Sequence, residues 1–297
     1  MSARATDRVV LAIVLSLVAL VLFDIMGLVI KLLSGRYGAA ELSTYRNLVG
    51  LVPSFVALTT SRSWVAAGRP IRIRQWKLGF ARGAMVTLAQ FLFYFSLGQM
   101  AFATASTLTY ANALFMTALA VPLLGERVGV LRWSAVLVGF VGVVLVMGPG
   151  QKDFGWVSLA PIGAAFFYAL SGVCARLVDD DVPSPLLNLY SSGTSLVGAF
   201  VLAMIVGGFS PIDDPMDLLW MAAMGVFGGC AVLFLVISYR MTEQSNLAPF
   251  SYFGIPLAFG LGWLFFGEAP FDDLFPGALL IAAGGLLVIW REQRSRR

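Results

Sequence analysis

Two stretches of the chain decide its fold: Pro122–Met147, PLLGERVGVLRWSAVLVGFVGVVLVM, and Trp263–Trp290, WLFFGEAPFDDLFPGALLIAAGGLLVIW. Each contains a Gly-Glu pair that separates two apolar runs. An ungapped overlay at an offset of 142 residues aligns five identical pairs: Gly125 with Gly267, Glu126 with Glu268, Ser96 with Ser238, Tyr110 with Tyr252 and Leu119 with Leu261. Because an apolar composition alone produces about half as many identities, the match indicates an internal repeat only together with the charges of the loops.

The composition places the chain in a membrane. Hydrophobic residues make up 59% of the chain, charged residues 12%, and the mean hydropathy is +0.86, whereas soluble domains carry about 25% charged residues. The apolar runs lack the alternating polar positions of a transmembrane barrel, so we predict an all-α integral membrane protein. The ten predicted transmembrane helices are Val9–Leu33, Leu42–Thr59, Leu78–Gln99, Phe102–Leu124, Trp133–Gly148, Gly155–Arg176, Pro185–Gly207, Pro215–Tyr239, Asn246–Phe266 and Leu274–Trp290.

Lysine and arginine residues predict the orientation. If the N-terminus is cytoplasmic, fifteen of them fall in cytoplasmic segments or span ends, and only Lys31, Arg36 and Lys152 face the other side. This asymmetry follows the positive-inside rule, so we predict that both the N- and C-termini are cytoplasmic. The Arg-rich C-terminus is interpreted as an anchor to anionic lipid of the bilayer, and no nucleic-acid partner is expected.

Equivalent loops carry opposite charge. The loop between the second and third spans holds five basic residues from Arg62 to Lys77, whereas its counterpart Gly208–Asp214 holds none. Residues 1–150 contain 13 basic and 4 acidic residues, and residues 151–297 contain 7 and 12. Two five-helix repeats of opposite orientation, residues 1–150 and 151–297, would produce this pattern, which is an architecture used by many secondary transporters.

On these motifs, and on STYRNLVGLVPSF (Ser43–Phe55) with its arginine, the chain resembles the drug/metabolite transporter superfamily in its ten-helix form with two EamA-type repeats. It is similar to YddG-type exporters of aromatic and other neutral amino acids. The family usually has a proline midway along the helix before Gly-Glu. Pro256 fits, but the first copy reads Asn112-Ala113-Leu114, which puts a proline kink of the fourth helix in doubt.

Other function classes lack their residues in the sequence. There is no P-loop for nucleotide hydrolysis and no histidine to act as general base or metal ligand. The three lysines lie near the membrane surfaces, and no charge ring or repeated filter loop of a channel is present. We therefore expect a transporter rather than an enzyme, with no cofactor and no metal site.

Charged groups within the spans are candidates for a binding site, since each costs about 2.5–3.5 kcal/mol at a helix centre. Asp24 and Arg46 are predicted at similar depth on adjacent helices, so they could form an ion pair. The pair could be purely structural, or it could contact a zwitterionic substrate, with Asp24 as a proton acceptor. Arg82 is expected to extend toward the cytoplasmic surface.

Polar and aromatic residues at mid-depth complete the predicted substrate site: Gln90, Tyr94, Tyr110, Asn112, Tyr168, Ser171 and Tyr252. The alternative is hydrogen bonding between helices, and close helix packing explains the glycines within the spans. Glu126 and Glu268 are expected to bind loop backbone or a neighbouring helix end, with gating as a lesser role.

We therefore predict a secondary transporter of the bacterial cytoplasmic (inner) membrane. It would export small amphipathic metabolites, such as neutral or aromatic amino acids, by alternating access, coupled to protons or another ion. The alternative is a uniporter or channel-like facilitator for a nucleoside, a sugar or a cationic drug.

Overall fold

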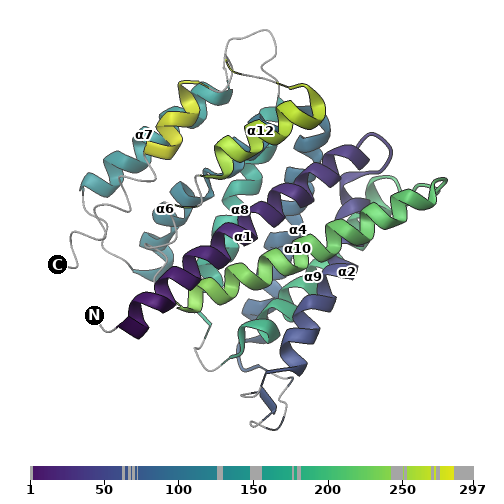
Figure 1. The fold of residues 1–297 in the computed structure, drawn as a ribbon, viewed down its shortest axis with the longest axis horizontal. Helices are drawn as coiled ribbons and strands as arrows, with labels where there is room; N and C mark the ends of the chain where they lie inside the picture. The colour runs from purple at the N-terminus through teal and green to yellow at the C-terminus, as the bar shows by residue number, and fades with distance from the viewer. Residues whose placement is uncertain are drawn as a thin grey trace.

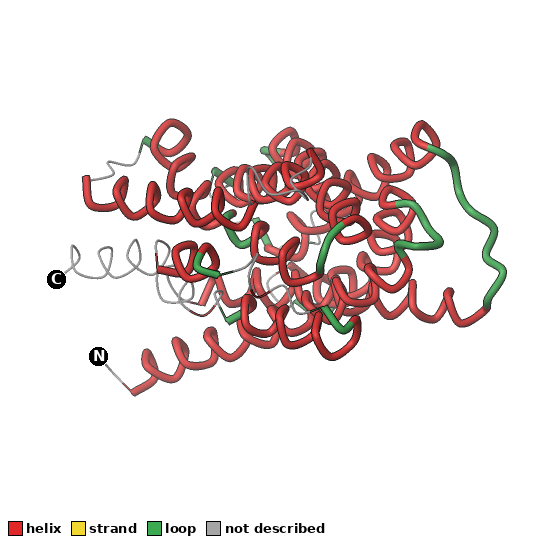
Figure 2. The backbone as a smooth tube through the Cα atoms, turned by 90° about the horizontal axis from the view of Figure 1, so that it is seen from above, coloured by secondary structure: helices red, strands yellow, loops and turns green. Residues whose placement is uncertain are grey.

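The computed structural model describes residues 3–61, 64–65, 68, 71, 73–125, 130–147, 156–175, 177–178, 182–241, 250, 253–268, 271 and 275–283. All regular structure in these residues is helical, as Figure 2 shows. The helices are α1 (Ala3–Leu33), α2 (Ala39–Thr59), α4 (Trp76–Gln99), α5 (Phe102–Thr109), α6 (Asn112–Leu124), α7 (Val130–Met147), the short 3₁₀ helix η1 (Trp156–Ser158), α8 (Leu159–Ala175), α9 (Ser184–Val206), α10 (Pro215–Met241) and α12 (Gly254–Phe266).

Most helices agree with the predicted spans to within a few residues, but α1 begins six residues before Val9. Helix α12 begins at Gly254, whereas the ninth span was predicted from Asn246, which lies outside the described residues. In the described part of the chain, six segments are long and apolar enough to cross a membrane: Val9–Leu33, Trp76–Gln99, Phe102–Leu124, Trp156–Ala175, Ser184–Val206 and Pro215–Leu235. Val136–Val146 and Gly254–Phe266 are shorter apolar helices. Of the predicted tenth span, the structure describes a helix over residues 277–283.

The fourth predicted span is interrupted at Tyr110 and Ala111, between α5 and α6. The Ala111 N–H donates to the Leu108 carbonyl oxygen at 3.1 Å, and the Leu114 N–H donates to Ala111 at 3.0 Å. Each of these hydrogen bonds joins residues three apart in the sequence, as in a 3₁₀ helix, and tightens the α-helix locally into a 3₁₀ turn. The helix is therefore interrupted without the proline that the family pattern would supply.

The helices that precede the two Gly-Glu pairs have the same length and the same ending. Helices α6 and α12 are each 13 residues long and start 142 residues apart. Both end at a glycine in the left-handed region, Gly125 at φ 67° and Gly267 at φ 65°. A side chain would be strained there, which explains the glycine in each copy.

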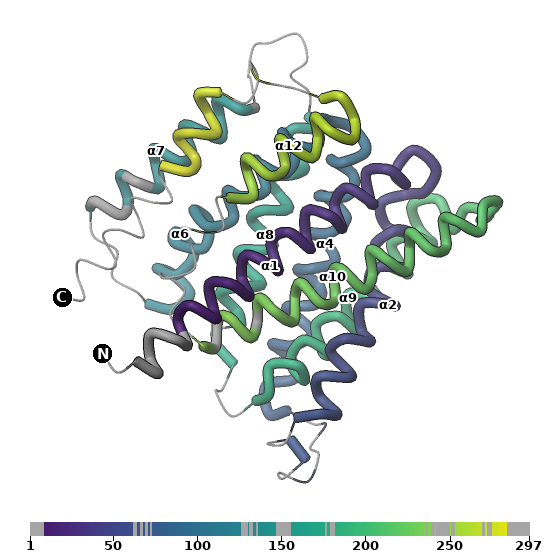
Figure 3. The backbone as a smooth tube through the Cα atoms, viewed as in Figure 1, coloured from purple at the N-terminus to yellow at the C-terminus, as the bar shows by residue number. Residues whose placement is uncertain are grey.

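The principal helix contacts join residues 1–150 to residues 151–297. Helix α1 lies between α10 and α12, α2 packs on α9 and α10, and α4 packs on α8 and α9 (Figures 1 and 3). Glycines permit the closest helix crossings, as the sequence analysis expected of glycines within the spans. A Cβ added to Gly229 of α10 would stand 2.7 Å from the Gly50 carbonyl oxygen, and one added to Gly142 of α7 would stand 2.6 Å from that of Gly277.

Candidate functional site

The carboxyl group of Asp24 lies inside the bundle with one oxygen unpartnered. Asp24 is on α1 and is only 5% exposed. Its Oδ1 accepts a hydrogen bond from the Tyr110 hydroxyl at 3.4 Å, whereas Oδ2 has no partner among the described residues. A buried carboxylate oxygen without a partner is costly unless it is protonated or receives a hydrogen-bond donor.

Tyr110 links Asp24 to the second half of the chain. It lies at the interruption between α5 and α6, and its ring rests on Gly254, the first residue of α12. A Cβ at Gly254 would overlap the Tyr110 hydroxyl. Glycine at this helix start therefore provides the space that lets Tyr110 reach Asp24.

The predicted ion pair between Asp24 and Arg46 does not form. Arg46 of α2 is 4% exposed, and its guanidinium donates to the Asn47 Oδ1 at 2.8 Å and to the Gly228 carbonyl oxygen of α10 at 3.1 Å. Its Nε has no partner in the described structure. Neutral oxygens rather than a carboxylate solvate this cation, because the rotation of α2 directs the guanidinium toward α10.

Gln90 of α4 joins a polar network between helices, as the alternative interpretation expected. Its Oε1 accepts hydrogen bonds from Asn47 Nδ2 at 2.7 Å, from Ser43 at 2.8 Å and from Ser195 of α9 at 3.2 Å. The sequence reasoning did not single out these three partners. The four-residue spacing of Ser43 and Asn47, which places them on one face of α2 beside Arg46, could have identified two of them.

Two of the predicted tyrosines lie near Arg46. Tyr94 of α4 is 1% exposed, and its hydroxyl has no partner in the described residues. Tyr94 and Tyr168 of α8 both lie within electrostatic range of Arg46. These side chains therefore form an aromatic and cationic group beside the network of Gln90.

The remaining predicted residues are less closely connected to this group. Asn112 begins α6 and is half-buried, and Tyr252 lies outside the described residues. Ser171 of α8 is buried, and its carbonyl oxygen accepts a hydrogen bond from Arg82 Nε at 3.0 Å. Arg82 also donates to the Ser191 hydroxyl at 3.2 Å, so it joins α4 to α8 and α9 rather than extending to the membrane surface.

Five buried side-chain atoms have no hydrogen-bond partner in the described structure: Asp24 Oδ2, Arg46 Nε, Tyr94 Oη, Ser106 Oγ and Thr107 Oγ1. They come from α1, α2, α4 and α5 and include a cationic donor, an acidic acceptor and three hydroxyls. Ser106 and Thr107 were missed by the sequence reasoning. Buried polar groups are normally satisfied, so each of these atoms is a candidate contact for a ligand.

The other buried carboxylates in the described part of the chain, Glu41 and Asp217, each bind more than one partner. Glu41 accepts from the Ser210 N–H at 3.1 Å and from its hydroxyl at 3.2 Å. Asp217 accepts from the Tyr37 hydroxyl at 2.8 Å and forms an ion pair with Arg36 at 2.7 Å. Burial is the main cause that raises the pKa of Tyr37 to about 12, and the hydrogen bond to the Asp217 carboxylate adds to it. Asp24 is thus set apart by its free oxygen.

The signature of the EamA-like transporter family matches residues 10–148 and again residues 155–290. The chain belongs to the EamA-like transporter family. With six long apolar helices in the described part of the chain, it is a multi-pass membrane protein.

Two of the relatives that the chain resembles are named as transporters of small molecules. The chain is 32% identical to a riboflavin transporter of Rhizobium johnstonii over 177 residues. This aligned segment covers 59% of this chain and 57% of the relative. The chain thus aligns with less than two thirds of that relative's length. It is 26% identical to an S-adenosylmethionine uptake transporter of Rickettsia prowazekii over 95% of this chain and 92% of the relative.

A solved crystal structure has the same fold. It superimposes with a TM-score of 0.65 over 96% of this chain and 99% of its own, at 19% sequence identity. At this identity the likeness concerns the helical architecture alone.

Proposed function

We propose that this EamA-family protein is a secondary transporter of the bacterial cytoplasmic membrane that takes up a planar heteroaromatic metabolite by alternating access. The observation that carries the proposal is the set of unpartnered polar atoms on four helices. The set includes the Tyr94 hydroxyl, Tyr110 donates to Asp24, and Tyr168 lies near Arg46. The two halves of the protein would be inverted repeats, residues 1–150 and 151–297, with both termini cytoplasmic, as the charge asymmetry supports.

The residues favour a solute that joins a ring to polar groups. Tyrosine faces stack on planar rings, while Arg46, Asp24 and the hydroxyls supply donors and acceptors. Riboflavin and S-adenosylmethionine, for which relatives are named, both combine a heteroaromatic ring with hydroxyl groups. The aromatic amino acids expected from the sequence offer a ring but fewer polar groups, so they rank second.

The test is solute uptake by purified protein in sealed liposomes. Radiolabelled riboflavin, S-adenosylmethionine, adenosine and tryptophan are each offered with and without a pH gradient. We expect saturable uptake of a heteroaromatic solute that is accelerated by the same unlabelled solute on the other side. Selective tryptophan transport would contradict the proposed substrate class, and unsaturable flux would indicate a channel-like facilitator.

Replacement of Tyr94 by phenylalanine is expected to weaken substrate binding without destabilising the protein. The change keeps the ring and removes a buried hydroxyl that no described residue satisfies. A neutral hydrogen bond contributes about 0.5–1.5 kcal/mol, so the KM of uptake should rise about three- to tenfold. The thermal midpoint should stay the same or rise.

Tyr190→Phe is the matched control. It removes the same hydroxyl group, but the Tyr190 hydroxyl already donates to the Ile71 carbonyl oxygen at 3.0 Å, and Tyr190 is far from Tyr94 in the sequence. Its KM should equal that of the unmodified protein. An unchanged KM in both variants would show that Tyr94 only packs.

A further inference from the structure

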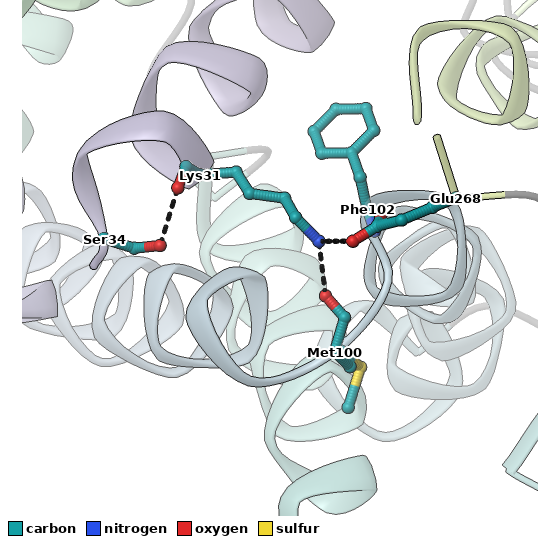
Figure 4. Close-up of polar contacts among 5 residues, drawn as sticks. All are labelled: Lys31, Ser34, Met100, Phe102 and Glu268. Atoms are coloured by element: carbon teal, nitrogen blue, oxygen red, sulfur yellow. Dashed lines mark hydrogen bonds and ion pairs between the residues drawn. The ribbon is translucent and has the colours of Figure 1, made fainter. Parts of the chain in front are cut away.

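The Lys31 end of α1 is tied to the second half of the chain by an ion pair. Lys31 Nζ lies 2.6 Å from Glu268 Oε1 and also donates to the Met100 carbonyl oxygen at 2.8 Å (Figure 4). The ammonium group stands 5.1 Å from the centre of the Phe266 ring. One lysine therefore contacts the end of α4 and the end of α12 at once.

The left-handed Gly267 places Glu268 at the start of another helix. Beyond this turn the Glu268 N–H donates to the Gly262 carbonyl oxygen at 3.2 Å, and its Oε2 accepts the Phe102 N–H at 2.8 Å. Phe102 is the first residue of α5, where backbone N–H groups lack partners within the helix and a negative charge is favoured. This confirms the expectation that Glu268 binds a neighbouring helix end.

An apolar layer adjoins these polar contacts. Ile30, Leu33, Leu97 and Phe102 are almost completely buried and belong to one core cluster with residues of α10 and α12. The Phe102 and Phe266 rings lie 6.4 Å apart. The ion pair and this layer together close the space between α1, α5 and α12 at the Lys31 end.

We propose that Lys31 and Glu268 form a latch that holds the transporter closed at the Lys31 end and releases when that end opens. Separation of α12 from α1 and α5 would break the contacts from Glu268 to Lys31 and to Phe102 in one step. The side chains are 11% and 28% exposed, so water can replace the partners when they part. The inference rests on the proposed alternating access.

The latch is tested by thiol labelling, which needs no known substrate. Ser106 is buried one turn after Phe102 on α5 and serves as the reporter position. Ser106→Cys is made in a protein whose two cysteines are replaced by Cys174→Ala and Cys230→Ala. A membrane-impermeant thiol reagent is then applied to each side of sealed vesicles.

We expect slow labelling of this reporter protein from the Lys31 side. Lys31→Met and Glu268→Gln, which keep side-chain size and remove one charge, should each raise the rate about tenfold from that side only. Arg36→Gln is the control, because it removes another ion pair at the same end, with Asp217, where the Arg36 side chain is 54% exposed. It should leave the rate unchanged.

The outcomes separate this inference from the proposed function. Equal labelling of the Lys31→Met, Glu268→Gln and reporter proteins would overturn the latch, even if a solute is transported. Faster labelling of the variants, together with no transport of any solute by the unmodified protein, would support the latch and contradict the proposed function. Gel filtration and thermal unfolding of each variant establish that faster labelling reflects opening and not unfolding.

Discussion

Replacing Asp24 by asparagine is expected to abolish accumulation driven by a pH gradient while substrate exchange continues. Asparagine has the shape of aspartate, keeps an oxygen for the Tyr110 hydroxyl, and cannot take up a proton. The buried, unpartnered Oδ2 of Asp24 is the proton acceptor in this hypothesis. Since each pH unit stores about 1.4 kcal/mol per proton, a coupled protein accumulates solute about tenfold per unit.

The measurement compares two assays in proteoliposomes. Accumulation under an imposed gradient of two pH units should fall at least about tenfold in Asp24→Asn, whereas counterflow exchange at equal pH should stay within about twofold. The stability of the variant should be unchanged or higher, because a buried ionisable group has been removed.

Asp217→Asn is the control carboxylate. Asp217 is also buried, but Arg36 and Tyr37 satisfy it, so its replacement should preserve the response to the gradient. If Asp24→Asn accumulates solute normally and retains the pH dependence, Asp24 is not the coupling group. If exchange is also lost, Asp24 binds the substrate.

The extent of the helices was predictable because it depends on local properties. Hydropathy located the spans, and Gly267 ends α12 in the left-handed conformation that glycine commonly adopts at the end of a helix. The interruption at Tyr110 had no local signal, since it occurs without proline and follows from tightening of the hydrogen bonds near Ala111.

The partners of the charged groups were not predictable in the same way. Depth along a helix follows from residue number, but each residue also turns the side chain by about 100° around the axis. The sequence assigned Asp24 and Arg46 similar depths, which suggested a pair, whereas packing directs one to Tyr110 and the other to Gly228. Only the tertiary arrangement determines such rotations.

Replacing Gly254 by alanine is expected to reduce transport about tenfold or more. The change adds only one methyl group, and it does so on α12, whereas Asp24 is on α1. The methyl would overlap the Tyr110 hydroxyl and displace the ring from its contact with Asp24. Overpacking of this kind costs about 1–3 kcal/mol, so the thermal midpoint should also fall by a few degrees. Uptake and thermal unfolding measure the two effects.

A control and a double variant distinguish this collision from a general effect on α12. Gly260→Ala lies in the same helix, and no neighbouring atom of the described structure lies within 4 Å of the added Cβ, so transport should be unchanged and the helix slightly more stable. In a Tyr110→Ala background the obstacle is gone, and Gly254→Ala should cause no further loss of uptake. Additive losses would instead mean that Gly254 acts independently of Tyr110, since residues coupled by direct contact give non-additive effects.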